Sequence, residues 1–193
     1  MNVYDAIRKR RTIRKFTQQP IDVETLTKLV DAARLAPQGA NLQPVKYLVV
    51  NEAQLLNSIF AATKWAAYIH PHGTPGEGER PTAYVVVLVD TEIKKAGYDI
   101  DAGAAVENML LAAVEEGLGS AWLGAIDRDQ IRSLLAIPER YIIHTLVALG
   151  YPGEDPTIED AGELIKYYKD EQGRLHVPKR RLQDLLFFNG MES

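Results

Sequence analysis

The sequence predicts a single domain of the α/β class, in which helices cover both faces of a central sheet. Three strongly apolar runs read as strands, at 45–50, 82–89 and 142–149, and helical patterns separate them. The run at 82–89 is apolar and β-branched almost throughout, which is typical of a strand buried on both faces. The chain has 193 residues, of which 46% are hydrophobic and 25% charged. This length suits one domain with one substantial core.

Two helices are expected before the first strand. Asn2 is a suitable N-cap for a short first helix. Asp22 is expected to cap a second helix, which ends before Pro37. The apolar stripes of these helices are Val3, Ala6 and Ile7, and Leu26, Leu29, Val30 and Ala33.

Between the first two strands we expect one helix and one loop. Asn51 is expected to cap the helix, whose apolar face includes Leu55, Leu56 and Ile59. Residues 70–81 hold three prolines and three glycines, which predicts a flexible loop able to cover a site. His70 and His72 leave a metal site as an alternative, but an ordinary exposed loop is favoured because no third ligand has an obvious spacing.

The longest helix is expected from about Asp99 or Asp101 to Glu116. It is rich in alanine and apolar almost all round, so it must be buried on more than one side. In a chain of this size, that pattern suggests packing against a second copy.

The remaining elements are shorter. Residues 120–123 read as a short strand or loop, and Asp127 and Gln130 form a capping box for a helix carrying Ile131, Leu134 and Leu135. Residues 165–169 and 174–177 are expected to pair as a hairpin around a turn at 170–173. A basic cluster, Lys179, Arg180 and Arg181, precedes a short closing helix at 182–188.

A basic run at 8–15 is the most unusual feature of the composition. Six of the 22 basic residues fall in these eight positions, although the whole chain has a net charge of −4. Guanidinium groups bind phosphate in a bidentate manner, so a bound anion is one explanation. A solvated helix end and a nucleic-acid or targeting segment are the alternatives.

Composition also restricts the class of protein. The chain has no cysteine, which excludes disulfides, thiolate nucleophiles and cysteine-bound metals. A sequence pI near 5.6 argues against a general nucleic-acid binder. No window approaches the roughly 20 apolar residues of a membrane span, and the N-terminus lacks the apolar run of a secretory signal. We therefore expect a cytoplasmic protein.

Four motifs in order resemble the nitroreductase family. They are RRTIRKF at 10–16, APQGANLQP at 36–44, GLGSAWLGA at 117–125, and LGYP at 149–152 followed by the basic cluster before the C-terminus. Each motif is weak alone, but together they cover essentially the whole chain. The resemblance implies FMN-dependent flavoproteins that take electrons from NADH or NADPH.

The resemblance also implies a fold and an assembly. The family fold is a three-layer α/β (α+β) sandwich, with a mostly antiparallel central sheet flanked by helices. It dimerises through a long central helix, and FMN lies at the dimer interface in contact with both subunits. The apolar helix near 101–116 matches that description.

Carried over by motif, the resemblance implies a set of FMN contacts. Arg10 and Thr12 would approach the phosphate and ribityl chain, and Arg14 the N1/O2 edge of the ring, where its charge would favour the reduced flavin. The second segment, at 37–43, would reach the neighbouring subunit's flavin. The implied contacts are Arg10, Arg11, Thr12, Arg14, Pro37, Gln38, Gly39, Asn41, Gln43, Trp122, Leu123, Gly124, Lys179 and Arg180, with Arg181 possible.

Two positions depart from the family pattern. Gln38 stands where serine is usual, and Val45 where tryptophan usually follows the Gln-Pro pair. Both departures put the choice of substrate in doubt rather than FMN binding.

The implied activity is hydride transfer from NADH or NADPH through FMN to a small acceptor such as a nitroaromatic or quinone. The chain lacks both GxGxxG after a strand and GxxxxGK[ST], which fits one pocket used in turn and ping-pong kinetics. No catalytic side chain and no metal are expected, since the cofactor carries the chemistry. Glu107 is a candidate acid, but a polar residue on such a helix is more often structural. The alternatives are a flavin-storage protein without turnover, its pocket closed by residues 70–81, and a nucleic-acid or anion-binding domain that uses residues 8–15.

Overall fold

A four-stranded antiparallel sheet forms the middle of the molecule. The computed structural model describes residues 1–70 and 72–191, so Pro71 of the expected loop lies outside the described residues. The sheet has the order β1-β2-β4-β3. Its strands are β1 (Val45–Val50), β2 (Ala83–Asp90), β3 (Gly119–Leu123) and β4 (Tyr141–Gly150). The three apolar runs are therefore confirmed as strands to within one residue at each end, and residues 119–123 form a fourth.

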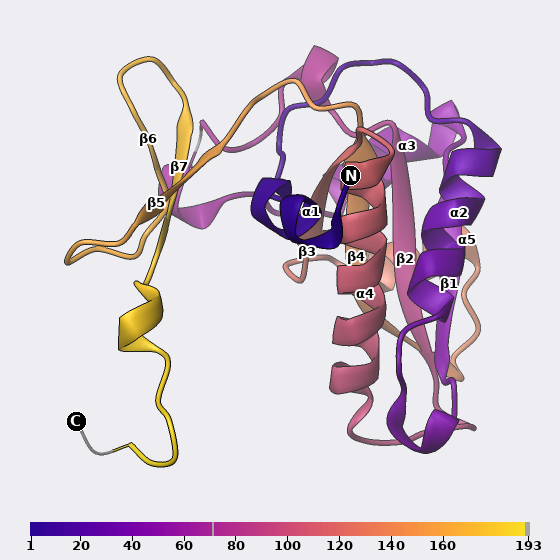
Figure 1. Cartoon of the computed structure of the whole chain (residues 1–193). Helices are drawn as coiled ribbons and strands as arrows, with labels where there is room; N and C mark the ends of the chain where they lie inside the picture. Colours follow the sequence, from indigo (N-terminus) through magenta and orange to yellow (C-terminus); the bar gives the residue numbers. More distant parts are fainter. Residues whose placement is uncertain (71, 192–193) are drawn as a thin grey trace.

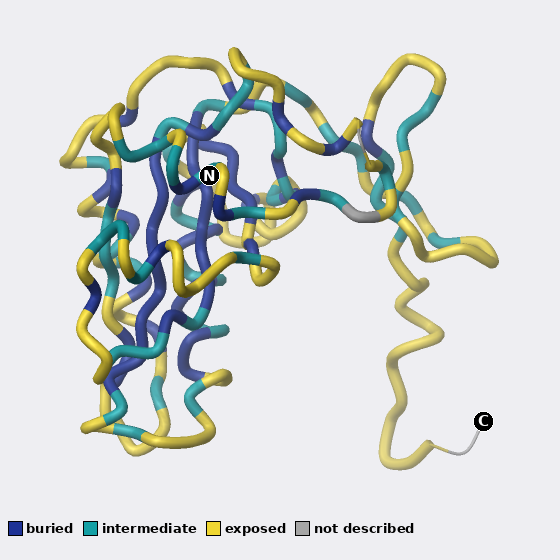
Figure 2. The backbone as a smooth tube through the Cα atoms, turned by 180° about the vertical axis from the view of Figure 1, so that it is seen from behind, coloured by how far each residue is buried: buried dark blue, intermediate teal, exposed yellow. Residues whose placement is uncertain are grey.

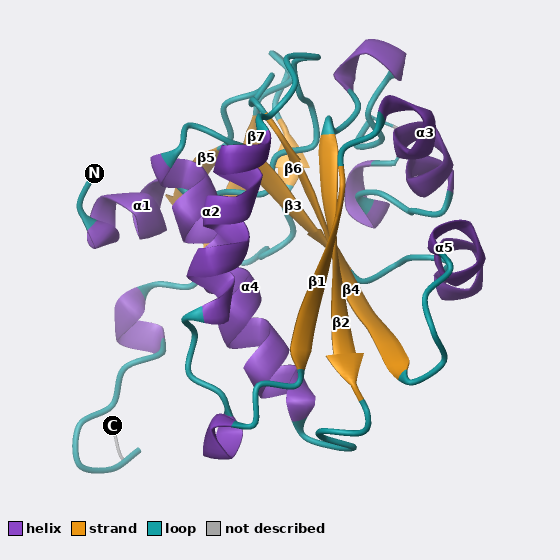
Figure 3. Ribbon diagram, turned by 90° about the vertical axis from the view of Figure 1, so that its right-hand side faces the viewer, coloured by secondary structure: helices purple, strands orange, loops and turns teal. Residues whose placement is uncertain are grey.

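Helices cover both faces of this sheet. α2 (Val23–Arg34) and α4 (Tyr98–Glu115) lie on one face, and α3 (Ala53–Ala61) and α5 (Arg128–Leu135) lie on the other (Figure 3). β2 is buried along its whole length, and its successive side chains point alternately into the two helical layers. Val85 and Val87 pack with α2 and α4, whereas Tyr84 and Val86 pack with α3 and α5. The three-layer α/β arrangement with an antiparallel sheet is confirmed.

Side-chain caps begin three of the helices as the sequence predicts. Asn2 caps α1 (Val3–Lys9), Asp22 caps α2, and Asp127 accepts the backbone N–H of Gln130 at 3.0 Å. The prediction for α3 was wrong. Two residues connect β1 to α3, so the N-cap position falls on Glu52 instead of Asn51, and no side chain caps this helix.

α4 is the longest helix and runs along the sheet in the centre of the molecule (Figure 1). It begins at Tyr98, directly after Gly97, whose φ of 68° favours glycine. One side packs on the sheet and another on α2. A third side, comprising Ile100, Gly103, Ala104, Glu107 and Leu111, stays partly or fully exposed.

The C-terminal segment forms a second, smaller sheet of order β5-β7-β6. β5 (Thr157–Asp160) runs parallel to β7 (Leu175–Lys179), and β6 (Tyr168–Lys169) pairs with β7 as the expected hairpin. This sheet stands away from the main one, and the chain after it is exposed (Figures 1 and 2). We call residues 157–191 the tail.

Two expectations for the tail are corrected. The first hairpin strand has only two residues, 168–169, instead of five. The closing helix expected at 182–188 shrinks to one 3-10 turn, η4 (Leu182–Asp184). The apolar side chains that would stabilise a helix here are exposed, so this chain provides no surface to bury them.

Three further 3-10 turns complete the fold: η1 (Gly39–Asn41), η2 (Ala67–Ile69) and η3 (Glu77–Glu79). η1 lies in the glutamine- and asparagine-rich segment, and η3 lies in the expected loop at 70–81. Across the described ranges, 1–70 and 72–191, no helix combines the length and the apolar character that crossing a membrane requires.

Candidate functional site

The basic run leaves α1 and continues along the edge of the main sheet. Thr12 forms a parallel bridge to Ser120 of β3, and the Ile13 N–H donates to the Ser120 carbonyl at 2.9 Å. Ile13 and Phe16 turn inward and are buried. Thr12 and Arg14 are only half-buried. The apolar residues anchor the segment and leave polar ones at the surface.

Two glycines make this close approach possible. A Cβ on Gly119 would lie 2.8 Å from Cγ1 of Ile13, and one on Gly150 would lie 2.8 Å from Cδ1 of Phe16. Both distances are shorter than any real contact, so a side chain at either position would force the segment away from β3 and β4. The absence of a Cβ therefore sets the position of residues 12–16.

Arg10 and Arg11 have different surroundings. The Nε of Arg10 lies 3.4 Å from Oε1 of Glu107 on α4, and both side chains remain partly exposed. Arg11 is buried, and its Nη2 donates to the carbonyls of Arg8 at 2.7 Å and Ile7 at 3.3 Å, at the end of α1. Burial lowers the pKa of Arg11, and the neighbouring charge of Arg10 lowers it further. Arg11 thus anchors the end of α1. Its role as a cofactor contact stays a prediction.

Arg14 lies against the tail. Its guanidinium carbon is 4.9 Å from the centre of the Tyr167 ring. Its backbone N–H donates to Oε1 of Glu154 at 2.6 Å. Burial lowers the pKa of Arg14, while Tyr167 and Glu154 partly oppose that shift.

The second predicted segment, residues 37–44, lies at the start of α4, whereas Arg10 pairs with Glu107 in the middle of this helix. The Gly39 N–H donates to Oδ1 of Asp101 at 2.8 Å, and Lys94 Nζ lies 2.5 Å from the other carboxylate oxygen. Burial alone would raise the pKa of Asp101, but these two contacts outweigh it and the pKa is lowered. A buried carboxylate therefore ties this segment to the start of α4.

The backbone of this segment is strained. Ala40, Asn41 and Gln43 have φ angles of 50°, 54° and 54°, in the left-handed region. Such conformations cost of the order of 1 kcal/mol each or more and collect at ligand sites. Oε1 of Gln38 is buried without a hydrogen-bond partner among the described residues. The segment therefore holds one amide oxygen, that of Gln38, which the described residues do not satisfy.

The third segment completes the edge of the sheet. Trp122 on β3 is 42% exposed, and its Nε1 donates to Oγ1 of Thr145 at 2.8 Å, which fixes the ring at the surface. A Cβ on Gly103 of α4 would lie 3.9 Å from this ring. Leu123 is buried and Gly124 is exposed at the end of the strand. An aromatic ring thus stands exposed next to the partly exposed side of α4.

The predicted C-terminal cofactor contacts lie away from the other segments. Lys179 ends β7, and Lys179 and Arg180 are exposed on the tail, apart from the main sheet (Figure 1). Arg181 pairs with Asp184 through its Nε at 3.2 Å. Within one copy, residues 12–13 meet the start of β3 and Trp122 follows on the same strand, whereas Lys179 and Arg180 lie on the tail and residues 37–44 lie at the start of α4.

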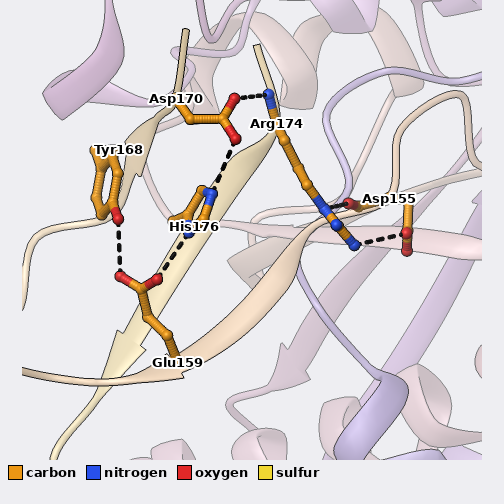
Figure 4. A network of polar contacts seen from close by, with 6 residues as sticks. All are labelled: Asp155, Glu159, Tyr168, Asp170, Arg174 and His176. Carbon is orange, nitrogen blue, oxygen red and sulfur yellow. Dashed lines mark hydrogen bonds and ion pairs between the residues drawn. The ribbon is translucent and has the colours of Figure 1, made fainter. Parts of the chain in front are cut away.

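The tail contains a polar network centred on His176 (Figure 4). Its Nδ1 lies 2.7 Å from Glu159 of β5, and its Nε2 lies 3.1 Å from Asp170 of the hairpin turn. The Tyr168 ring stacks on the imidazole at 4.9 Å, and its hydroxyl donates to Glu159 at 3.0 Å. The hydrogen bonds to Glu159 and Asp170 raise the pKa of His176.

Five residues of the expected loop line a cleft: His70, His72, Thr74, Gly76 and Glu79. The cleft has a volume of about 850 Å³ and lies between this loop and the β6–β7 hairpin. His70 and His72 both border it. In residues 1–70 and 72–191, no group of three or more metal-ligating side chains comes together.

Sequence reasoning missed several residues that shape the site. Asp101, Glu154 and Tyr167 each contact a predicted segment, yet they lie 62, 140 and 153 positions from the residue they touch. No spacing rule connects positions so far apart. Glu107 could be singled out in advance, as a charge in the middle of a largely apolar helix.

Comparison with known proteins bears on the family and the fold. Residues 7–151 match the profile of the nitroreductase family. A protein of Archaeoglobus fulgidus, named for an expected NADH dehydrogenase or NAD(P)H nitroreductase activity, is 34% identical over 161 residues, which cover 80% of this chain and 87% of the relative. The NADPH-flavin oxidoreductase of Vibrio harveyi is 26% identical, over 82% of this chain and 69% of its own length.

Solved structures show the same fold. One from Desulfovibrio desulfuricans, described as a nitroreductase and determined in complex with FMN, superposes with a TM-score of 0.71 and 29% identity. The match covers 100% of this chain and 99% of that one.

Proposed function

Since the chain belongs to the nitroreductase family, we propose that it is an oxidoreductase that binds FMN and takes electrons from NADH or NADPH. The family match and the relatives named for NAD(P)H- and flavin-dependent reactions support this class. The observation that carries it to this chain is the basic run, held at the start of β3 with Arg10, Thr12 and Arg14 only half-buried.

The residues present fit FMN. A phosphate and a hydroxylated chain need cationic and hydroxyl donors, which Arg10 and Thr12 supply on one edge. The edge of a heteroaromatic ring needs donors and acceptors together, which carboxamides supply, and Oε1 of Gln38 is buried without a partner in the described part of the chain. The carboxylate of Glu107 could repel the phosphate, but its charge is offset by the ion pair with Arg10.

Bound FMN would supply the redox chemistry that links the reduced nicotinamide to the acceptor. The protein's own residues would bind and orient it. Arg14 would place a positive charge at the edge of the ring that becomes negative on reduction. Trp122 would border the ring beside α4, and no side chain is needed as an acid or nucleophile.

We include a homodimer in this proposal. The basic cluster of the tail (Lys179, Arg180 and Arg181) and residues 37–44 both lie apart from residues 10–14 within one copy of the chain. A single site that uses all three segments therefore needs a second copy. The exposed apolar residues of the tail and the third side of α4 are surfaces that a second copy would cover. The exposed apolar tail residues include Leu182, Leu185, Leu186, Phe187, Phe188 and Met191.

The finer parts of the proposal concern the reaction partners. The acceptor would be a small molecule such as a nitroaromatic or quinone, reduced in a ping-pong cycle at the pocket the nicotinamide has left. The whole chain, 1–193, would act as one FMN-binding domain in the cytoplasm. Nothing in the proposal requires nucleic acid or a membrane.

The test begins with the absorbance spectrum of the purified protein after reconstitution with FMN. NADH and then NADPH are added without oxygen, and the flavin bands are followed. Bleaching by either donor supports the oxidoreductase and identifies the donor. Bound flavin that neither donor bleaches favours the storage protein. Failure to bind FMN at all would refute the proposal.

A further inference from the structure

Arg14 differs from Arg10 and Arg11 of the basic run in what surrounds its guanidinium. Arg10 pairs with a carboxylate, and Arg11 donates to backbone carbonyls. In the described residues, the guanidinium of Arg14 has neither an ion pair nor a hydrogen bond, although the side chain is half-buried and burial lowers its pKa. The face of Tyr167 lies against the guanidinium, and the nearby charge of Glu154 acts on it without a direct ion pair among the described residues.

Tyr167 belongs to a column of four side chains. The guanidinium carbon of Arg14 lies 4.9 Å from the Tyr167 ring centre, and the ring centres of Tyr167 and Tyr68 lie 5.2 Å apart at an angle of 54°. Lys166 Nζ closes the column, 5.3 Å from the centre of Tyr68. The four residues come from three segments: the basic run, η2 and the part of the tail before β6. The column therefore joins the proposed cofactor site to two segments that are remote in sequence.

An aromatic face holds a guanidinium in a particular way. The negative face of the ring attracts the cation, while the N–H groups, which lie in the guanidinium plane, are left available. A carboxylate in the same place would neutralise the charge and use two N–H groups. Stacking therefore orients Arg14 and preserves both its charge and its donors.

We propose that Tyr167 is the positioning residue of Arg14, and that Tyr68 supports it, so that the charge and N–H groups of Arg14 are directed to the ring edge of bound FMN. This inference rests on the proposed function, because it assigns Arg14 to the flavin. Because Tyr167 is a tail residue, the position of the tail would also affect the cofactor site.

The test compares four variants in FMN affinity, by fluorescence quenching, and in the midpoint potential of bound FMN. Tyr167→Leu removes the ring, and Tyr167→Phe keeps it without the hydroxyl. Tyr168→Leu is the matched control, because its ring stacks on His176 instead of Arg14. Tyr68→Leu removes the supporting ring only.

Tyr167→Leu should weaken FMN binding by about threefold to thirtyfold, the range of cation–π interactions, and should lower the potential. Tyr167→Phe should match the wild type, and Tyr168→Leu should keep its potential. Tyr68→Leu should shift both quantities in the same direction as Tyr167→Leu but by less. It also provides the test if Tyr167→Leu does not fold.

A double-mutant cycle separates positioning from general damage. Arg14→Ala alone should lower the potential, and adding Tyr167→Leu to it should lower the potential no further. Additive effects, or an unchanged potential in both Tyr167→Leu and Tyr68→Leu, would overturn the inference. A wild-type protein that does not bind FMN would instead refute the proposed function, so the two failures can be distinguished.

Discussion

At the scale of single residues, the arginines of the basic run show how the same side chain serves different purposes. Arg11 is buried against the end of α1, where its guanidinium satisfies carbonyls that the helix leaves open. Arg10 and Arg14 stay partly exposed and face α4 and the tail. A pattern of like residues in a sequence therefore defines a charged segment, but the contacts of each residue decide its role.

Asp101 is the residue whose loss should cost most at this scale. Asp101→Ala removes a buried carboxylate and leaves the Lys94 ammonium and the Gly39 N–H without their partner. We expect the free energy of unfolding to fall by about 3 kcal/mol, as for other broken buried pairs. Urea denaturation measures this change.

Asp99→Ala is the matched control, because Asp99 lies in the same first turn of α4 but its side chain is 76% exposed. Its effect should stay below about 1 kcal/mol. Equal effects of the two substitutions would show that the helix terminus matters, and not the buried pair.

At the scale of elements, the basic run depends on β3 for its position. Gly119→Ala would place a Cβ 2.8 Å from Ile13, so either Ile13 or the whole segment must move. We expect a loss of about 1–3 kcal/mol in unfolding free energy, the usual cost of overpacking. FMN binding should weaken as well, because Thr12 and Arg14 move with Ile13.

Gly78→Ala serves as the control for this change, since a Cβ on Gly78 meets nothing within 4 Å. Titration with FMN and thermal denaturation measure both effects. If Gly119→Ala binds FMN as tightly as Gly78→Ala does, residues 12–16 do not determine the affinity.

The tail sheet should respond to pH through His176. Its pKa is raised in the folded state, so its contribution is complete below the unfolded value of about 6.5 and is lost as pH rises through the raised value. The pKa values of Glu159 and Asp170 are lowered, so their contribution is lost as pH falls below about 4. The sheet should thus be most stable between about pH 4.5 and 6.5.

Hydrogen exchange of the β7 backbone amides, expressed relative to intrinsic rates, tests this window. Protection should decrease above pH 6.5, near the unfolded pKa. His176→Gln should remove that decrease while keeping a hydrogen-bonding side chain. A wild-type profile that stays flat above this pH would contradict the assignment.

At the scale of the whole molecule, the arrangement of exposed apolar side chains predicts association. Leu182 and Phe188 on the tail are 72% and 80% exposed. Replacing both with aspartate would place two charges in the proposed interface. We expect the dimer to dissociate about a hundredfold more readily, and FMN to be lost with it.

Sedimentation over a range of concentrations, with detection of flavin absorbance, measures both. Leu35→Asp is the control, because Leu35 is also exposed, at 65%, but lies at the end of α2 instead of on the tail. A wild-type monomer that retains FMN would contradict the shared site.

The sequence by itself determined the elements of this protein and the candidates for its site. Continuous apolar runs predicted the main strands, because a strand covered on both faces is apolar throughout. Apolar stripes of helical spacing predicted most of the helices, because one helix face is buried. The motifs around residues 10–16, 36–44 and 117–125 identified the family. Local signals failed at Asn51, where the connection was one residue longer, and at 182–188, where no surface in the chain covers the apolar residues.

Only the tertiary structure decided which residues meet. Asp101 holds Gly39, Tyr167 stacks on Arg14, and Gly119 admits Ile13 because the fold brings distant segments into contact. These contacts depend on a chain path that no local pattern encodes. The energy of a contact comes from proximity in space, whereas a sequence pattern reports only the burial of each residue's own element.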